Sequence, residues 1–157
     1  MQLIGTYTFR TSAATVWHLL NDPEVIASCL PGCDRLEPLG DDRYKANLSV
    51  AVAAIGGQYS GTVALLDKDP PHGYRLVVEG SGKAGFVSGE ARIALTEHEG
   101  TTTIGVNGEG HVGGLMARVG QRLLGSVSQM MMDRFFACLR AKAESQNDAR
   151  ASPQGTG

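Results

Sequence analysis

Residues 102–143 read TTIGVNGEGHVGGLMARVGQRLLGSVSQMMMDRFFACLRAKA, and the hydrophobic period changes within this stretch. As far as Val112, apolar or small residues alternate with polar ones, which predicts a β-strand. Gly113-Gly114 then frees the backbone to change direction. From Leu115 to about Ala143 there is no proline, and apolar residues recur at helical spacing. This pattern predicts a helix of roughly 29 residues, about 43 Å long, which is enough to cross a whole sheet.

The chain before this stretch predicts a sheet for the helix to cover. Residues 2–10 alternate as a strand, and two short helices follow, separated by Asn21-Asp22-Pro23. These helices are predicted at residues 13–20 and 24–29, and five more strands at 33–39, 44–54, 59–65, 74–78 and 86–97. Short consecutive strands joined by turns favour an antiparallel sheet with one apolar face. We therefore predict an α+β fold in which a curved, seven-stranded antiparallel sheet wraps around the long C-terminal helix.

Length and composition predict one domain. The chain has 157 residues, of which 42% are hydrophobic and 19% charged, as in globular proteins. We place the domain at residues 1–144. The chain is polar after Glu144 and poor in large apolar residues, so we predict a disordered polar tail at residues 145–157.

Charge and hydropathy argue against several classes of protein. The net charge of −2 and the lack of clustered lysine and arginine argue against nucleic-acid binding. No segment reaches 18 uninterrupted apolar residues, so no transmembrane helix is expected, and the N-terminus does not resemble a secretory signal. The odd number of cysteines, Cys29, Cys33 and Cys138, predicts free thiols in a reducing cytoplasm.

The predicted inner face of the sheet is unusually rich in small residues. They are Ala46, Ala54, Gly61, Gly80, Gly89, Ala91, Gly108 and Gly110. One interpretation is that the glycines only bend the sheet. The other is that they leave space beneath the helix, which we favour for the set because a close-packed interior needs side-chain volume. Methionines on the facing helix fit irregular ligand shapes, although such a stripe alone is more typical of a core.

These patterns predict an apolar ligand pocket of roughly 300–1,000 Å³. Its predicted ligand-binding residues are Phe86, Val87, Ala91, Val106, Leu115, Met116, Val119, Leu123, Val127 and Met130. Its predicted mouth consists of Trp17, Leu20, Leu30 and Pro31, at the two short helices and the turn after them. For Trp17, a place in the ordinary core is an equally good interpretation.

We find no constellation of catalytic or metal-binding residues. His18, His72, His98 and His111 do not pair at metal-ligand spacing with each other or with cysteine. Cys29 and Cys33 have no second pair to complete a site. We therefore predict a protein that is not an enzyme, with no catalytic residues, metal or covalently bound cofactor.

Three segments resemble the family of the carbon monoxide dehydrogenase G subunit. They are Val16-Trp17-His18-Leu19-Leu20-Asn21-Asp22-Pro23-Glu24-Val25 with Cys29-Leu30-Pro31-Gly32-Cys33, then Leu66-Asp67-Lys68-Asp69-Pro70-Pro71-His72-Gly73-Tyr74, and Val112-Gly113-Gly114-Leu115-Met116-Ala117 with Gly120-Gln121-Arg122-Leu123-Leu124. The resemblance covers about residues 2–144. It implies the START-like helix-grip fold and a non-catalytic accessory role beside molybdenum hydroxylases of the carbon monoxide and xanthine dehydrogenase type.

The resemblance also implies a bound quinone or lipid, molybdenum hydroxylase subunits as partners, and peripheral contact with the inner face of the cell membrane. A polyketide cyclase or aromatase on the same fold is the alternative, and a generic lipid carrier is a third. An enzyme would need polar groups converging in the pocket, such as Tyr59, Glu90 or His111. The predicted register places Glu90 and His111 on the outer face, which favours the ligand carrier.

Overall fold

The computed structural model describes residues 1–52 and 55–151, with side chains as far as residue 145. One sheet, three α-helices and a short 3₁₀ helix make up this part of the chain. In chain order they are β1 (Gln2–Phe9), α1 (Ala13–Leu20), α2 (Pro23–Cys29), β2 (Cys33–Gly40), β3 (Arg43–Val50), β4 (Gly57–Asp69), β5 (Gly73–Gly82), β6 (Gly85–His98), β7 (Thr101–Gly113), η1 (Gly114–Arg118) and α3 (Gln121–Ala151). The predicted order of elements is confirmed.

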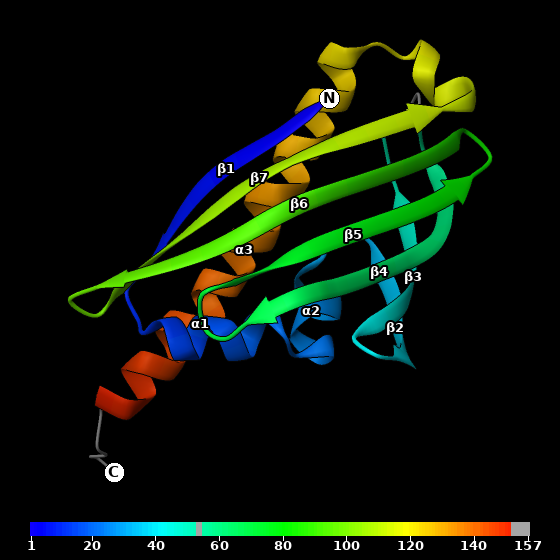
Figure 1. Ribbon diagram of the computed structural model, residues 1–157. Coiled ribbons are helices and arrows are strands. Elements are labelled where there is room, and N and C mark those ends of the chain that lie inside the picture. Colours follow the sequence, from blue (N-terminus) through cyan, green and yellow to red (C-terminus); the bar gives the residue numbers. More distant parts are fainter. Residues whose placement is uncertain (53–54, 152–157) are drawn as a thin grey trace.

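The seven strands form one antiparallel sheet in the order β1-β7-β6-β5-β4-β3-β2. From β2 to β7, each strand pairs with the next one along the chain as a hairpin. The first strand, β1, pairs with the other edge of β7. The sheet curls around α3, so that β2 and β3 lie behind the plane of β5 and β6 (Figure 1). The predicted curved sheet around a long C-terminal helix is therefore confirmed.

The two short helices close one end of the curled sheet, which we call the base. Ser12 caps α1 by accepting a hydrogen bond from the Thr15 backbone N–H. Asp22 caps α2 in the same way, and Pro23 begins this second helix, where its missing N–H costs nothing. Asn21-Asp22-Pro23 thus ends one helix and starts the next, as the sequence predicts.

The long helix differs from its prediction at both ends. Residues from Leu115 do not start a continuous helix, because η1 ends at Arg118 and Gly120 follows with a φ of +99°. Glycine adopts this left-handed conformation without a steric penalty, and α3 begins after it at Gln121. At the other end, α3 continues to Ala151, so the predicted disordered tail begins inside the helix. Residues 152–157 lie outside the described residues.

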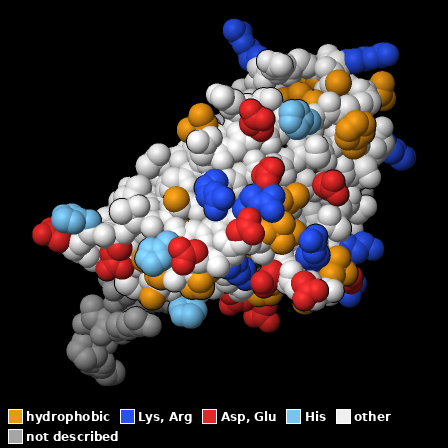
Figure 2. All heavy atoms as spheres, in the orientation of Figure 1, with side chains coloured by type: hydrophobic (Ala, Val, Ile, Leu, Met, Phe, Trp, Pro, Cys, Tyr) orange, Lys and Arg blue, Asp and Glu red, His pale blue; other side chains and the backbone are white. Residues whose placement is uncertain are grey.

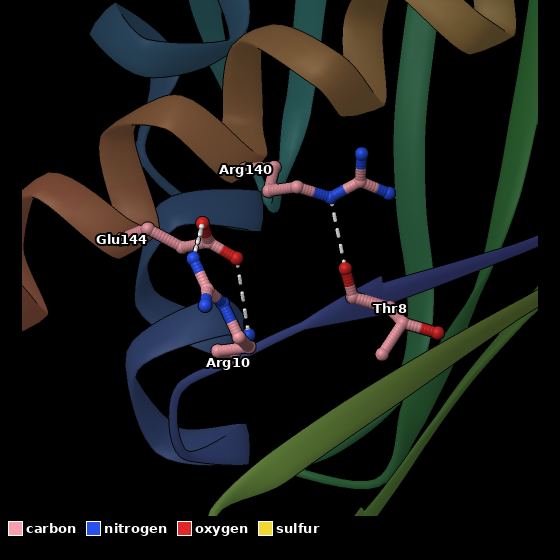
Figure 3. A network of polar contacts seen from close by, with 4 residues as sticks. All are labelled: Thr8, Arg10, Arg140 and Glu144. Atoms are coloured by element: carbon pink, nitrogen blue, oxygen red, sulfur yellow. Dashed lines mark hydrogen bonds and ion pairs between the residues drawn. The ribbon is translucent and has the colours of Figure 1, made fainter.

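Polar contacts and a disulfide hold α3 against the base. The Arg140 Nε donates to the Thr8 carbonyl oxygen at 2.9 Å, and Arg10 binds the Glu144 carboxylate at 3.2 Å (Figure 3). This hydrogen bond to Arg10 lowers the pKa of Glu144. A disulfide joins Cys29 at the end of α2 to Cys138 on α3.

The disulfide corrects the prediction for the cysteines. Cys33 keeps a free thiol, whereas Cys29 and Cys138 do not. The prediction missed the pair because 109 residues separate the two cysteines and only the fold brings α2 beside α3. The cysteine content therefore no longer supports a reducing compartment.

The apolar residues of the inner face divide between two clusters. The base core contains Tyr7, Phe9, Val16, Trp17, Leu19, Leu20, Tyr44, Leu65, Tyr74, Ala91, Ile93, Leu95, Ile104, Val106, Phe136, Leu139 and Ala143. The tip core, at the opposite end, contains Ile55, Tyr59, Met116 and Leu124, with half-buried neighbours that include Val87, Val119 and Val127. The sheet between these two cores is the region of interest for function.

Candidate functional site

Between the two cores, the concave face of the sheet is nearly free of side chains. This concave strip consists of Gly61 on β4, Val78 and Gly80 on β5, and Gly89 on β6. The register places Gly61 beside Gly80, and Val78 beside Gly89. All four residues are half-buried. The predicted inner-face positions of the glycines are thus correct, while Ala54 lies outside the described residues.

The glycines of the inner face serve two different purposes. At Gly61 and at Gly108, a Cβ atom would overlap the carbonyl oxygen of a neighbouring strand, so close approach of the backbones requires glycine. At Gly80, the nearest atoms to a Cβ would be 3.5–3.9 Å away, and at Gly89 they would be 3.3–3.7 Å away. All of these atoms belong to neighbouring strands and none to α3. The neighbouring strands therefore do not require glycine at Gly80, in contrast to Gly61.

Three apolar side chains of α3 are half-buried and belong to neither core. Leu123, Met130 and Met131 are half-buried and are absent from both the base core and the tip core. Leu123 and Met130 lie four residues before and three residues after Val127, so all three share one side of the helix. Val127 packs on the tip core. These side chains are available to contact an apolar ligand.

The inner face of the sheet carries one carboxylate at the base, Glu97, which lies in register with the buried Thr102 and accepts a hydrogen bond from the Ala13 backbone N–H at 2.7 Å. The concave strip itself contains no charged residue. Four tyrosines also lie on the inner face, namely Tyr7, Tyr44, Tyr59 and Tyr74. Burial raises the pKa of Tyr74 and of Tyr59, whose hydroxyl donates to the Ile55 carbonyl oxygen at 2.5 Å. The concave strip is therefore free of charged side chains, whereas Glu97 places a carboxylate at the base.

Tyr7 joins the inner face of the sheet to a carboxylate of α3. Its hydroxyl donates to Asp133 Oδ1 at 2.8 Å, and Gln129 donates to the same oxygen at 2.8 Å. The Tyr7 ring stacks on Phe136 with 4.3 Å between centroids. Burial and the neighbouring Asp133 raise the pKa of Tyr7 to about 12. The sequence predicted Tyr7 as a strand residue but offered no signal for this pairing.

Two of the three polar candidates for an enzyme, Glu90 and His111, lie on the other face of the sheet, whereas Tyr59 lies on the inner face. Glu90 forms an ion pair with Arg75, which also binds Asp67 at 2.9 Å. His111 is exposed and pairs in register with Ser88. Because Val87 faces inward and successive strand residues alternate, Ser88 and His111 face outward. Glu90 and His111 thus lie outside, as the register predicts.

The structure distributes the predicted ligand-binding residues among three environments. Ala91 and Val106 are part of the base core, whereas Val87, Met116, Val119 and Val127 belong to the tip core or pack on it. Leu123 and Met130 are half-buried and belong to neither core. Phe86 and Leu115 are 55% and 59% exposed, so including them among the pocket walls was wrong. Successive strand residues face opposite ways, and Val87 takes the inner face.

Half of the predicted mouth is also wrong. Trp17 and Leu20 are 8% and 2% exposed and lie in the base core, where Trp17 meets Tyr74 edge to face at 5.7 Å. They fill the core because α1 packs directly against α3 and the ends of β6 and β7. Leu30 and Pro31 are half-buried beyond α2, and their role stays a prediction.

Two shallow hollows occur elsewhere on the described surface. One, of about 680 Å³, lies on the outer face of the sheet among Thr6, Ala94, Thr96 and Thr103. The other, of about 420 Å³, lies between Leu19, Val25 and Ala141. Neither is lined by the predicted ligand-binding residues. Within the described ranges, no group of three or more potential ligands could hold a metal ion, and no helix is long and apolar enough to span a membrane.

Several solved structures are similar to this fold. A conserved protein from Geobacillus kaustophilus is 34% identical, with a TM-score of 0.89 over 92% of this chain and 96% of that one. A START superfamily protein from Mycobacterium smegmatis is 12% identical, with a TM-score of 0.72 over 92% of this chain and 98% of that one. The Zhui aromatase/cyclase from Streptomyces sp. R1128 is 15% identical, with a TM-score of 0.68 over 92% of this chain and 93% of that one.

Comparison with proteins of curated function found no match. The model of the CoxG family, which is described as the G subunit of carbon monoxide dehydrogenase, matches residues 5–144, most of the chain. The three motifs quoted from the sequence lie within this range. The chain therefore belongs to the CoxG family, and its fold is START-like.

Proposed function

We propose that this protein is a non-catalytic accessory protein of a molybdenum hydroxylase of the carbon monoxide or xanthine dehydrogenase type. It binds an apolar ligand, a quinone or a lipid, between the concave strip and α3. It thereby helps electron transfer or membrane association of the enzyme, on the cytoplasmic side of the cell membrane. Family membership supports the accessory role, and the concave strip supports the ligand.

The observation that carries the proposal is the glycine-rich concave strip between the two cores, which contains no charged residue. Gly80 and Gly89 have no atom of α3 among their nearest neighbours, while Leu123 and Met130 remain half-buried nearby. When an apolar molecule covers accessible apolar surface, the burial stabilises the complex by about 25 cal/mol per Å². A flexible methionine adapts to the shape of such a molecule.

A cyclase or aromatase is the second candidate, because the Zhui aromatase/cyclase shares the fold and Tyr7 places a hydroxyl beside Asp133. With its pKa raised to about 12, Tyr7 is protonated at neutral pH and can donate a hydrogen bond but cannot act as a base. The absence of charged residues from the concave strip favours the carrier. A generic lipid carrier would bind the same ligands without binding the hydroxylase.

The first test is mass spectrometry of an organic extract from the purified protein, together with binding of a dansyl-labelled fatty acid. We expect a co-purified quinone or lipid and saturable binding of the probe. Leu123→Trp should abolish probe uptake, because the larger ring occupies the space beside the strip. Overpacking costs about 1–3 kcal/mol, so the variant should still fold.

Gln121→Trp is the matched control, since Gln121 is exposed and lies two residues before Leu123, on the opposite side of α3. If Leu123→Trp folds and binds the probe as tightly as the wild type, the ligand lies elsewhere. Turnover of a polyketide substrate that is lost in Tyr7→Phe would favour the enzyme. Co-purification with hydroxylase subunits separates the accessory protein from a generic carrier.

A further inference from the structure

The end of the molecule opposite the two short helices carries exposed apolar side chains beside basic ones. The tip surface consists of Lys83 in the β5–β6 turn, Phe86 on β6, and Leu115, Arg118 and Arg122 on and after η1. Phe86 and Leu115 are 55% and 59% exposed. They lie close together, because Phe86 pairs with Gly113 and the Met116 N–H donates to the Ala84 carbonyl oxygen at 2.5 Å.

Charge is distributed unevenly over this end. The whole chain has a net charge of −2, yet residues 80–89 and 110–132 contain no aspartate or glutamate. Lys83, Arg118 and Arg122 are exposed, and none of them forms an ion pair with a described side chain. In Figure 2, basic side chains project from the upper end of the molecule next to apolar side chains. The tip surface is therefore cationic with apolar protrusions.

The β3–β4 connection reaches the same end of the molecule. Residues 50–57 read VAVAAIGG and contain no charge. Ile55 packs with Met116 in the tip core, directly beneath η1. Ile55 thus places an apolar side chain of this connection against η1.

We infer that the tip surface binds an anionic lipid bilayer. Lysine and arginine attract anionic headgroups, and single exposed apolar side chains enter the interface without needing a partner of fixed shape. A protein partner would be expected to meet a larger contiguous apolar patch with a central anchor. Two exposed apolar side chains accompanied by three cations fit a fluid surface better.

The purpose of this membrane contact rests on the proposed function, because an apolar ligand would enter or leave the protein through the tip surface. Val87, Val119 and Val127 line the tip core immediately behind the tip surface. The concave strip begins at the next inward-facing positions, since Gly89 follows Val87 by two residues. A ligand leaving the bilayer at the tip would therefore have only a short path to the strip.

Sedimentation with lipid vesicles tests the inference without any ligand. The full chain should bind vesicles of phosphatidylcholine mixed with phosphatidylglycerol, and bind those of phosphatidylcholine alone much more weakly. Added salt should weaken the binding, because it screens exposed charges. Arg118→Gln with Arg122→Gln should weaken it by roughly tenfold to thirtyfold, and Phe86→Ser with Leu115→Ser should weaken it even at high salt.

The controls are matched in type and exposure but lie elsewhere. Leu39→Ser removes a side chain that is 56% exposed at the far end of β2, and Arg43→Gln with Arg92→Gln removes two exposed arginines. Both controls should bind like the wild type. Equal loss in the controls and the tip variants, or no binding of the wild type to anionic vesicles, would overturn the inference.

The outcomes also separate this inference from the proposed function. If the wild type takes up the dansyl-labelled fatty acid but binds no vesicles, the carrier stands and the bilayer surface does not. If it binds vesicles through the tip surface but takes up no probe, the reverse holds. Capture of an acidic protein by the tip surface without vesicle binding would assign the surface to that protein and overturn the lipid assignment.

Discussion

Gly61 and Gly80 are neighbours in register on the concave face, yet only one of them is required by the backbone. A Cβ at Gly61 would overlap the Glu79 carbonyl oxygen, whereas a Cβ at Gly80 would meet only ordinary contacts. Neither residue has a positive φ. Glycine at 80 therefore keeps space open, while glycine at 61 allows two strands to approach.

We predict opposite effects for the same substitution at these two positions. Gly80→Ala should raise the free energy of unfolding by about 0.4–1 kcal/mol, because alanine restricts the unfolded chain. Gly61→Ala should lower it by about 1–3 kcal/mol through overpacking. Urea denaturation measures both. If Gly61→Ala proved as stable as the wild type, the close approach of β4 and β5 would be wrong.

The Tyr7–Asp133 hydrogen bond makes the stability depend on pH in the alkaline range. The folded pKa of Tyr7 is about 12, above the ordinary value of 10.0. A group with a raised folded pKa binds its proton more tightly in the native state, so its contribution to stability is complete below pH 10 and is lost as the pH rises to about 12. Burial is the largest cause of the shift, and Asp133 is the second.

We predict that Asp133→Asn lowers the pKa of Tyr7 below 12 but leaves it above 10.0, because burial remains. The ultraviolet absorbance of phenolate reports the titration, and Tyr7→Phe identifies the contribution of this tyrosine among the four. An unchanged Tyr7 titration in Asp133→Asn would show that the carboxylate does not contact the hydroxyl.

At the scale of elements, the C-terminal half of α3 is held far more firmly than its start. The disulfide to α2, the Arg10–Glu144 ion pair and the Arg140 hydrogen bond all involve residues of α3 from Cys138 onward (Figure 3). Arg140 also lies over the Phe9 ring at 5.7 Å. The start of α3 follows Gly120, where the backbone changes direction.

We predict that reduction of the disulfide destabilises the domain. The bond joins residues that are 109 positions apart, and such a cross-link typically contributes about 2–4 kcal/mol by restricting the unfolded chain. Cys138→Ser should lower the urea midpoint to that of the reduced wild type, whereas Cys33→Ser should retain the difference between oxidised and reduced protein. Reaction of all three thiols without a reductant would contradict the pairing.

Over the whole molecule, the two ends have different characters. The base is closed by α1 and α2, whose apolar residues fill the base core, and it is tied to α3 by the contacts described above. The tip has a smaller core, a short η1 and exposed apolar side chains. Under the proposed function, we therefore expect a ligand to enter at the tip, opposite the mouth predicted from the sequence.

Much of the architecture could be predicted because local periodicity reports secondary structure directly. The alternation from Tyr44 onward, the Asn21-Asp22-Pro23 break and the apolar spacing after Gln121 each depend on nearby residues alone. Their order then leaves few topologies for an antiparallel sheet with one apolar face. The small-residue inner face followed from the same alternation.

The sequence by itself determined the elements, the family and the apolar, glycine-rich inner face. Only the tertiary structure decided that Trp17 fills the base core, that Phe86 faces outward, and that Cys29 meets Cys138. Each of these depends on which distant segments become neighbours, and on which side of a curled sheet a residue falls near the end of a strand. Periodicity specifies a face locally, but packing between distant elements decides whether that face is filled, covered or open.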